Sequence, residues 1–249
     1  SESAKVAVVI FLVHLGTLTV LVGVAGWYLA THGLGTLELN FQAPLKGSIG
    51  TALFYGFSAA MLGISGFESS ANFVEEQAEG VFQKTLRNMW VVVSFFNPVL
   101  ALLAVGVLPL VTVGQHTETL LSYLGQVAGG RWLATLISID AVAVLSGAVL
   151  TSFVGVSGLM KRMALDRIWP QSFLKENRRG SNYIILISFF ALCISILLIT
   201  RGQLGPLAGV YTISFLSVMA FFAIGNFLLK GKRRRLPRPV YATIPTVVL

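Results

Sequence analysis

The sequence predicts an all-α integral membrane protein with about six transmembrane helices. Of its 249 residues, 55% are hydrophobic and only 11% are charged, which is far from the composition of a soluble domain. Six apolar runs reach the length of about 20 residues that a helix needs to cross the hydrocarbon core. The basic residues, moreover, gather in alternate loops, as they do in multi-pass membrane proteins.

We expect one transmembrane domain fragment over residues 1–249. The first span follows Lys5 and runs through apolar residues to Leu29, and a polar, glycine-containing loop separates it from the second. The second begins at Ile49, and its later half carries glycines, serines and carboxylates. The expected spans, in order, are residues 5–29, 49–76, 88–111, 132–160, 182–200 and 206–229, with the start of a further span near 240–249.

The fourth expected span is longer than a bilayer requires. Its apolar run continues into M-K-R-M-A-L-D-R-I-W-P, which suggests a tilted helix that projects into the cytoplasm. Because the residue before a proline disfavours helical geometry, we expect this helix to end at Trp169, before Pro170.

The loop between the third and fourth spans has apolar residues at helical spacing beside polar ones. The apolar positions are Leu120, Leu121, Leu124 and Val127. We expect a short amphipathic helix here, lying across the outer mouth. Two roles remain open for it, a lid over the mouth or an interfacial helix that anchors the loop.

Charge distribution predicts how the chain sits in the cell membrane. The formal net charge is +8, yet all but three of the 18 Lys and Arg residues lie before the first span or after the second, fourth and sixth. Only Lys46, Arg131 and Arg201 fall in the other loops. This positive-inside pattern predicts that both ends of the chain are cytoplasmic, and it argues against a nucleic-acid site.

The second span contains the most informative stretch, G-I-S-G-F-E. Glycines and serines interrupt the apolar run, and a broken helix is tolerated at membrane depth only where its freed amides and carbonyls are buried or line a cavity. Transporters use such groups as ligands, so the amides of residues 65–68 could hold a substrate carboxylate. The alternative is a Gly-x-x-Gly packing contact between helices. The ionisable Glu68 favours a functional site. The expected substrate-binding residues are Gly63, Ile64, Ser65, Gly66, Phe67 and Glu68.

Polar residues in two other spans are candidates for ion or proton coupling. A lone histidine such as His14 is ordinarily a hydrogen-bonded structural residue, but it titrates near neutral pH and suits proton coupling in a transporter. Asp140 has a similar case, weakened by its place nearer the outer end of its span. Thr151 and Ser152 would ordinarily bond to carbonyls of their own helix, and the alternative is that they bind a sodium ion.

Several classes of function are not supported by any motif. The single Cys193 lies in an apolar span, so it allows no intrachain disulfide and we assign it to packing. We find no P-loop, no histidine pair at metal-binding spacing and no nucleophile elbow. The sequence therefore predicts neither an enzyme nor a cofactor or metal.

Three stretches resemble one transporter family. The run G-F-E-S-S-A-N-F-V-E-E-Q followed by K-T-L-R-N resembles the sixth helix and following loop of the amino acid, polyamine and organocation (APC) superfamily. E-S-A-K-V resembles the beginning of that family's fifth helix, and G-L-M-K-R-M-A-L-D-R-I-W-P-Q-S-F resembles the end of its eighth. The resemblance covers essentially the whole chain, as helices five to ten and the start of the eleventh.

This resemblance implies a partial inverted-repeat (5+5) fold with substrate held between unwound stretches of helices one and six. Glu68 falls where related exchangers have a glutamate, and His14 falls where some sodium-independent relatives carry a lysine. Thr151 and Ser152 fall where sodium-coupled proteins place hydroxyl ligands. The missing N-terminal helices of the same parent protein are then expected as partners, together with the lipid bilayer and a small substrate.

We therefore expect a secondary active transporter of amino acids or related amines that works by alternating access, coupled to protons or to exchange. The alternative is a non-transporting structural or sensing module with the same architecture.

Overall fold

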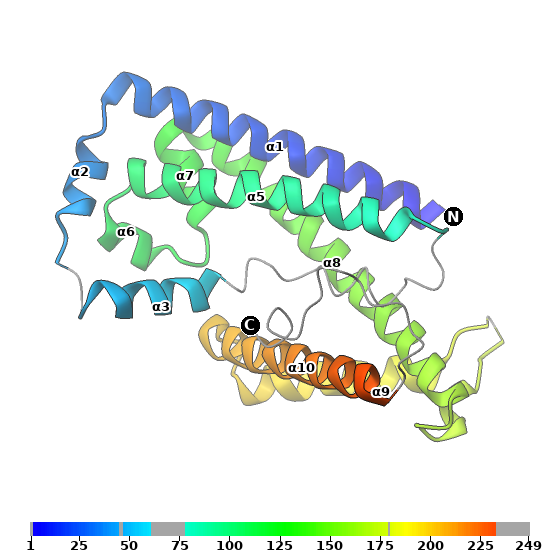
Figure 1. The fold of residues 1–249 in the computed structure, drawn as a ribbon. Helices are drawn as coiled ribbons and strands as arrows, with labels where there is room; N and C mark the ends of the chain where they lie inside the picture. The colour runs from blue at the N-terminus through cyan, green and yellow to red at the C-terminus, as the bar shows by residue number, and fades with distance from the viewer. Residues whose placement is uncertain (1, 45–46, 61–77, 179, 233–249) are drawn as a thin grey trace. The chain divides into compact units, whose positions relative to one another are not determined.

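The computed structural model describes residues 2–44, 47–60, 78–178 and 180–232, and among them it contains helices and no strand. This confirms the all-α class. The helices are α1 (Glu2–His32), α2 (Gly35–Phe41), α3 (Ile49–Ala60), α5 (Val81–Val107), α6 (Leu110–Gln115), α7 (Leu120–Gly129), α8 (Arg131–Leu165), the 3-10 helix η3 (Gln171–Leu174), α9 (Tyr183–Ile199) and α10 (Leu204–Lys232) (Figure 1).

Four of the described helices are long and apolar enough to cross a membrane. They cover Val6–His32, Val81–Val107, Arg131–Leu165 and Leu204–Gly225. Two further apolar helices, α3 and α9, are shorter. Residues 61–77, which hold the later half of the expected second span, lie outside the described residues, as does the span expected near 240–249. Six crossings therefore remain a prediction.

The chain divides into two compact units, residues 1–189 and 190–249, with the boundary inside α9. In the first unit α1 packs against α5, α7 and α8, and α1 and α5 run side by side in Figure 1. The core of this unit is formed by aliphatic side chains from these four helices: Leu18, Leu21, Ala25, Leu100, Leu103, Leu124, Leu133 and Ile137.

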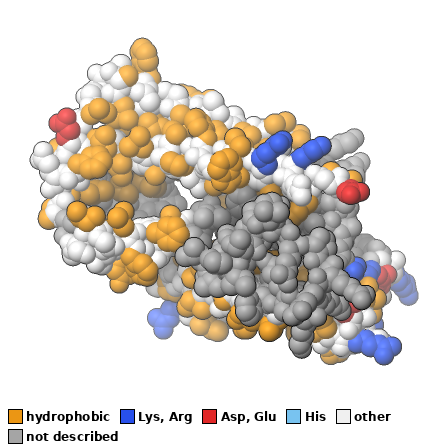
Figure 2. All heavy atoms as spheres, in the orientation of Figure 1, with side chains coloured by type: hydrophobic (Ala, Val, Ile, Leu, Met, Phe, Trp, Pro, Cys, Tyr) orange, Lys and Arg blue, Asp and Glu red, His pale blue; other side chains and the backbone are white. Residues whose placement is uncertain are grey.

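Most of the large apolar side chains outside this core are exposed. Examples are Phe57, Ile139 and Phe221, each more than 60% exposed. In Figure 2 the described part of the visible face carries many hydrophobic side chains and few charged ones. Water would make such a surface costly, whereas the acyl chains of a bilayer are as apolar as the side chains, so the surface fits a membrane environment.

The expected amphipathic helix near residues 114–130 is present as α7, which α6 precedes. Leu124 and Gly125 of α7 are buried, and the helix packs against α1, α5 and α8. The hydroxyl of Ser122 donates to the carbonyl of Ala134 at 3.2 Å, which ties α7 to the first turns of α8. α7 is therefore an integral part of the first unit. Its role as a lid or an anchor remains a prediction.

Helix α8 ends four residues earlier than the sequence predicts, because a terminating motif precedes the proline. Its last residue is Leu165, and Arg167 adopts a left-handed conformation with φ of 58°. The amide of Ile168 donates to the carbonyl of Met163 at 2.9 Å, and the amide of Arg167 donates to that of Ala164 at 3.1 Å. These two bonds form a Schellman motif, so the expectation that the helix continues to Trp169 was wrong.

The side chain of Asn40 ties α2 to the junction of α5 and α6. Its amide nitrogen donates to the carbonyls of Val105 at 2.7 Å and Leu108 at 2.8 Å, and its oxygen accepts from the amide of Leu110 at 3.0 Å. Asn40 thereby satisfies backbone groups at the end of α5 and the beginning of α6, where helices leave such groups unpaired.

Candidate functional site

The inner face of α1 carries the first site residue. Thr17, Leu21 and Ala25 are buried at a spacing of about one helical turn, and His14 lies one turn before Thr17 on the same face. Because this face packs against α8, the imidazole of His14 is directed to a neighbouring helix.

The facing side of α8 follows the same spacing. Leu133, Ile137 and Asp140 are all buried, at intervals of four and three residues. The carboxyl group of Asp140 is thereby directed toward α1. Its side chain is only 4% exposed, which is rare for an aspartate unless it is paired.

The imidazole of His14 and the carboxyl group of Asp140 form a hydrogen-bonded pair between α1 and α8. Nδ1 of His14 lies 2.7 Å from Oδ2 of Asp140, within the range of a charge-assisted hydrogen bond. The other carboxylate oxygen, Oδ1, is buried without a hydrogen-bond partner among the described residues. The His14 side chain is 32% exposed, so within the pair Asp140 is buried and His14 is accessible.

The accessible member faces a cavity of about 540 Å³ between α1 and α8. Apolar side chains form most of its wall, and His14 and Thr151 are the polar residues among those that line it: Val6, Ala7, Ile10, Phe11, His14, Val144, Gly147, Leu150, Thr151 and Val154. An apolar cavity with few polar groups is the usual form of a small-molecule site.

The two predicted hydroxyl residues of α8 differ in their surroundings. Thr151 shares the cavity wall with His14, whereas Ser152 is not among the lining residues. Each hydroxyl donates to a carbonyl of its own helix, Thr151 to Gly147 at 2.8 Å and Ser152 to Ala148 at 2.9 Å. This is the ordinary role of such hydroxyls, and it leaves their oxygen lone pairs available.

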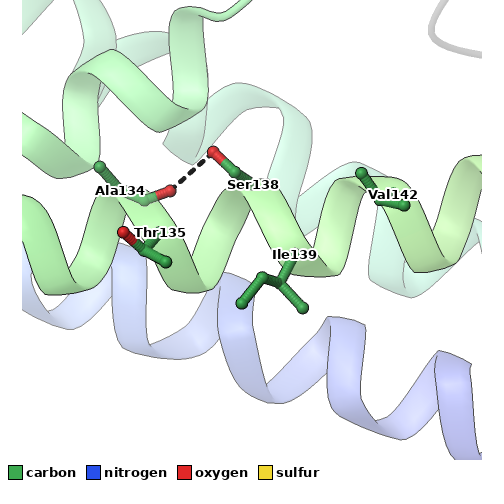
Figure 3. Close-up of a pocket in the computed structure, with 5 residues that line it drawn as sticks. All are labelled: Ala134, Thr135, Ser138, Ile139 and Val142. Atoms are coloured by element: carbon green, nitrogen blue, oxygen red, sulfur yellow. Dashed lines mark hydrogen bonds between the residues drawn. The ribbon is translucent and has the colours of Figure 1, made fainter.

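A second hollow, of about 430 Å³, is lined by residues of α8 alone: Ala134, Thr135, Ser138, Ile139 and Val142 (Figure 3). The hydroxyl of Ser138 donates to the Ala134 carbonyl at 2.8 Å, so its proton is already engaged. The hollow is a recess along one helix with no converging set of free polar groups, and we assign it no ligand.

The candidate substrate residues 63–68, Glu68 included, lie outside the described residues. In the part that is described, His14 and Thr151 come together at one cavity, and no cluster of His, Cys, Asp or Glu could hold a metal ion. The pairing of His14 with Asp140 was not predicted. The available signal was that each is the only ionisable residue for eight positions on either side.

Comparison with known proteins gives the family. The model of the amino acid permease family matches residues 1–249. The branched-chain amino acid permease BcaP of Bacillus subtilis (strain 168) is 24% identical over 238 residues, which are 95% of this chain and 49% of the permease. The chain thus spans about half the length of this curated relative. No solved structure matches it. Since the family model covers every residue, the chain belongs to the amino acid permease family, within the APC superfamily.

Proposed function

We propose that this chain is part of a secondary active transporter that moves amino acids or related amines across the cell membrane by alternating access, coupled to protons or to exchange. The observation that carries the proposal is the family match over residues 1–249. Membership in a permease family points to a transporter rather than an enzyme.

The site geometry supports the coupling part of this proposal. A cavity between two helices that are long enough to span a membrane has an ionisable group, His14, in its wall. Ionisable groups inside spans mark substrate, ion or proton pathways, because burying them without a function is costly. Residues 63–68 remain the proposed substrate stretch. Its amides would hold a substrate carboxylate, and Glu68 would contact the amine.

Transport is tested with the full-length gene product reconstituted into liposomes. Because the relative's name specifies branched-chain amino acids, leucine, isoleucine and valine are the first substrates, followed by other amino acids and by amines. We expect uptake driven by an inward proton gradient, or exchange against internal substrate. Neither uptake nor exchange of any of these compounds would contradict the proposal and would favour the non-transporting structural or sensing module.

Proton coupling predicts a specific effect of His14→Ala. This variant should lose the component of uptake that depends on a pH gradient, since the imidazole that exchanges the proton is removed. Thr19→Ala is the matched control, because Thr19 is exposed on the same helix and its hydroxyl donates to its own helix at the Leu15 carbonyl. Unchanged pH dependence in His14→Ala, or uptake that strictly requires sodium, would transfer the coupling role to Thr151 and Ser152.

A further inference from the structure

We infer that the proton-binding site is the His14–Asp140 pair, in which Asp140 is a proton-binding residue and not only a link between helices. This inference rests on the proposed transport function. Three observations carry it: the contact of 2.7 Å between Nδ1 and Oδ2, the burial of Asp140, and the partnerless Oδ1.

The charge of the pair explains why one proton is retained. When the pair holds one proton beyond those of a neutral imidazole and a carboxylate, its net charge is zero. This is true whether the proton resides on the imidazole or on the carboxyl group. Without it, a carboxylate that is 4% exposed stands beside a neutral imidazole, and an uncompensated buried charge is strongly unfavourable. A proton shared between the two groups therefore avoids an uncompensated buried charge.

The unpaired Oδ1 indicates that the carboxyl group takes part in holding this proton. An ionised carboxylate carries charge on both oxygens, and each oxygen then calls for a donor. In the described part of the chain only Oδ2 has one, from His14. A proton on Oδ2, shared with Nδ1 of His14, would leave Oδ1 as a neutral carbonyl oxygen, for which the lack of a donor is less costly than for a carboxylate oxygen.

Other titratable groups on the surrounding helices do not neutralise the pair. α1 and α8 pack with α5, α7 and η3, and η3 carries no titratable side chain. On the remaining helices the titratable groups other than the pair are Glu2, Lys5, Tyr28 and His32 on α1, Lys84 and Arg87 on α5, Tyr123 on α7, and Arg131, Lys161 and Arg162 on α8.

Their positions keep these groups apart from the pair. The nearest along α1 and α8 are Lys5 and Arg131, each nine residues away, or about 13 Å at helical rise. Lys84 and Arg87 lie in the first two turns of α5 and are exposed, and the ion pairs found among the described residues involve neither of them. Among the described residues, His14 is therefore the titratable group that contacts the carboxyl group of Asp140.

The exposure of the two partners sets the path of the proton. Asp140 is sealed, and His14 is one-third exposed at the cavity wall, so the proton leaves through the imidazole. In this step the N–H bond of the imidazolium breaks, the proton passes to a cavity water, and the pair changes from neutral to one negative charge. The hydrogen bond between His14 and Asp140 connects α1 and α8. Release of the proton places a negative charge at this bond, so it is linked to a change in the contact between the two helices.

The test compares two modes of transport by the full-length gene product in liposomes. Accumulation driven by a pH gradient requires net proton movement, whereas exchange of internal for external substrate does not. Asp140→Asn cannot ionise, and it should lose accumulation and its pH profile while exchange is retained. Asp140→Glu keeps an ionisable carboxyl group, so it should retain both the pH-driven accumulation and its pH profile. Ser146→Ala is the matched control on α8, since Ser146 is exposed and its hydroxyl donates to its own helix at the Val142 carbonyl.

A swapped variant keeps the test decisive if Asp140→Asn fails to fold. The double change His14→Asp with Asp140→His restores an acid and a base on opposite helices, and we expect it to regain pH-driven accumulation. An Asp140→Asn protein that folds and accumulates substrate with the wild-type pH profile would overturn the inference. A wild-type protein that transports nothing would instead overturn the proposed function, so the two failures are distinguishable.

Discussion

At the scale of single residues, His14 and Asp140 show how the meaning of a side chain depends on its partner. A histidine or an aspartate alone in an apolar helix can be a structural residue or a functional one, and the contact between His14 and Asp140 means that the role of each depends on the other. Removing one partner of a buried polar pair is destabilising, because the remaining group is left without its counterpart. Loss of activity after a single truncation is therefore ambiguous. Comparing Asp140→Asn with Asp140→Glu, which keeps the acid, is more informative.

Gly125 gives a prediction about packing at the residue scale. A Cβ atom at this position would lie 2.5 Å from Cδ1 of Ile137 and 3.2 Å from Cγ of Leu133, so Gly125→Ala forces side chains of α8 to move. Overpacking of this kind costs about 1–3 kcal/mol. The better helix propensity of alanine offsets up to about 1 kcal/mol of this cost, so we expect Gly125→Ala to lower the free energy of unfolding by about 1 kcal/mol, measured by denaturant titration in detergent micelles.

Gly23 supplies the matched control for this packing effect. It also lies inside a helix, but a Cβ there would meet nothing within 4 Å. Gly23→Ala should therefore be neutral or stabilising by up to about 1 kcal/mol, because alanine is the better helix former. Equal effects of the two substitutions would show that α7 does not pack as closely on α8 as described.

At the scale of elements, two helices end with an arginine where glycine is more common. Arg167 after α8 and Arg201 after α9 have φ of 58° and 53°. At the end of α9 the amides of Arg201 and Gly202 donate to the carbonyls of Leu198 and Leu197, as at the end of α8. The left-handed conformation is costly for residues with a Cβ. The motif was missed from the sequence because its usual glycine is absent.

The conformation of Arg167 predicts that glycine is better tolerated there than alanine. Arg167→Gly should raise the free energy of unfolding by roughly 1 kcal/mol, because glycine adopts positive φ without a steric cost. Arg167→Ala removes the same charge and keeps the Cβ, so it is the control. Thermal unfolding in detergent would compare the two variants, and no difference between them would contradict a left-handed residue at this position.

At the scale of the whole molecule, composition predicts the membrane environment of the chain, and the charge pattern predicts its orientation. The exposed apolar side chains of the described helices agree with an environment of lipid. The orientation in the membrane remains a prediction from the loops, since all but three of the 18 basic residues lie on the side expected to be cytoplasmic.

Cysteine labelling tests that orientation. In a Cys193→Ser background of the full-length gene product, Thr117→Cys lies between α6 and α7 and Ser172→Cys lies after α8; both positions are exposed. A maleimide that cannot cross membranes should label Thr117→Cys in intact cells and Ser172→Cys only after permeabilisation. The reverse pattern would invert the topology, and labelling of both in intact cells would mean that α8 does not cross the membrane.

The candidate site was partly predictable from the sequence. His14, and Thr151 together with Ser152, are predicted as polar residues in apolar spans, and the structure places His14 and Thr151 at one cavity. Ser152 was chosen on the same grounds and does not line that cavity. The position of Asp140 nearer the outer end of its span does not indicate its importance, because α8 is 35 residues long and Asp140 contacts His14. Gly63 to Glu68 remain a prediction.

The sequence by itself determined that this protein is helical and belongs in a membrane, because the length of an apolar run is a local property. It also contained the motifs that indicate the permease family. Only the tertiary structure decided which polar groups meet. In α1 and α8 apolar residues are spread around all sides, so hydrophobicity does not indicate which face of each helix is turned inward. That rotation is set by packing, and it joins His14 to Asp140 across 126 residues of chain.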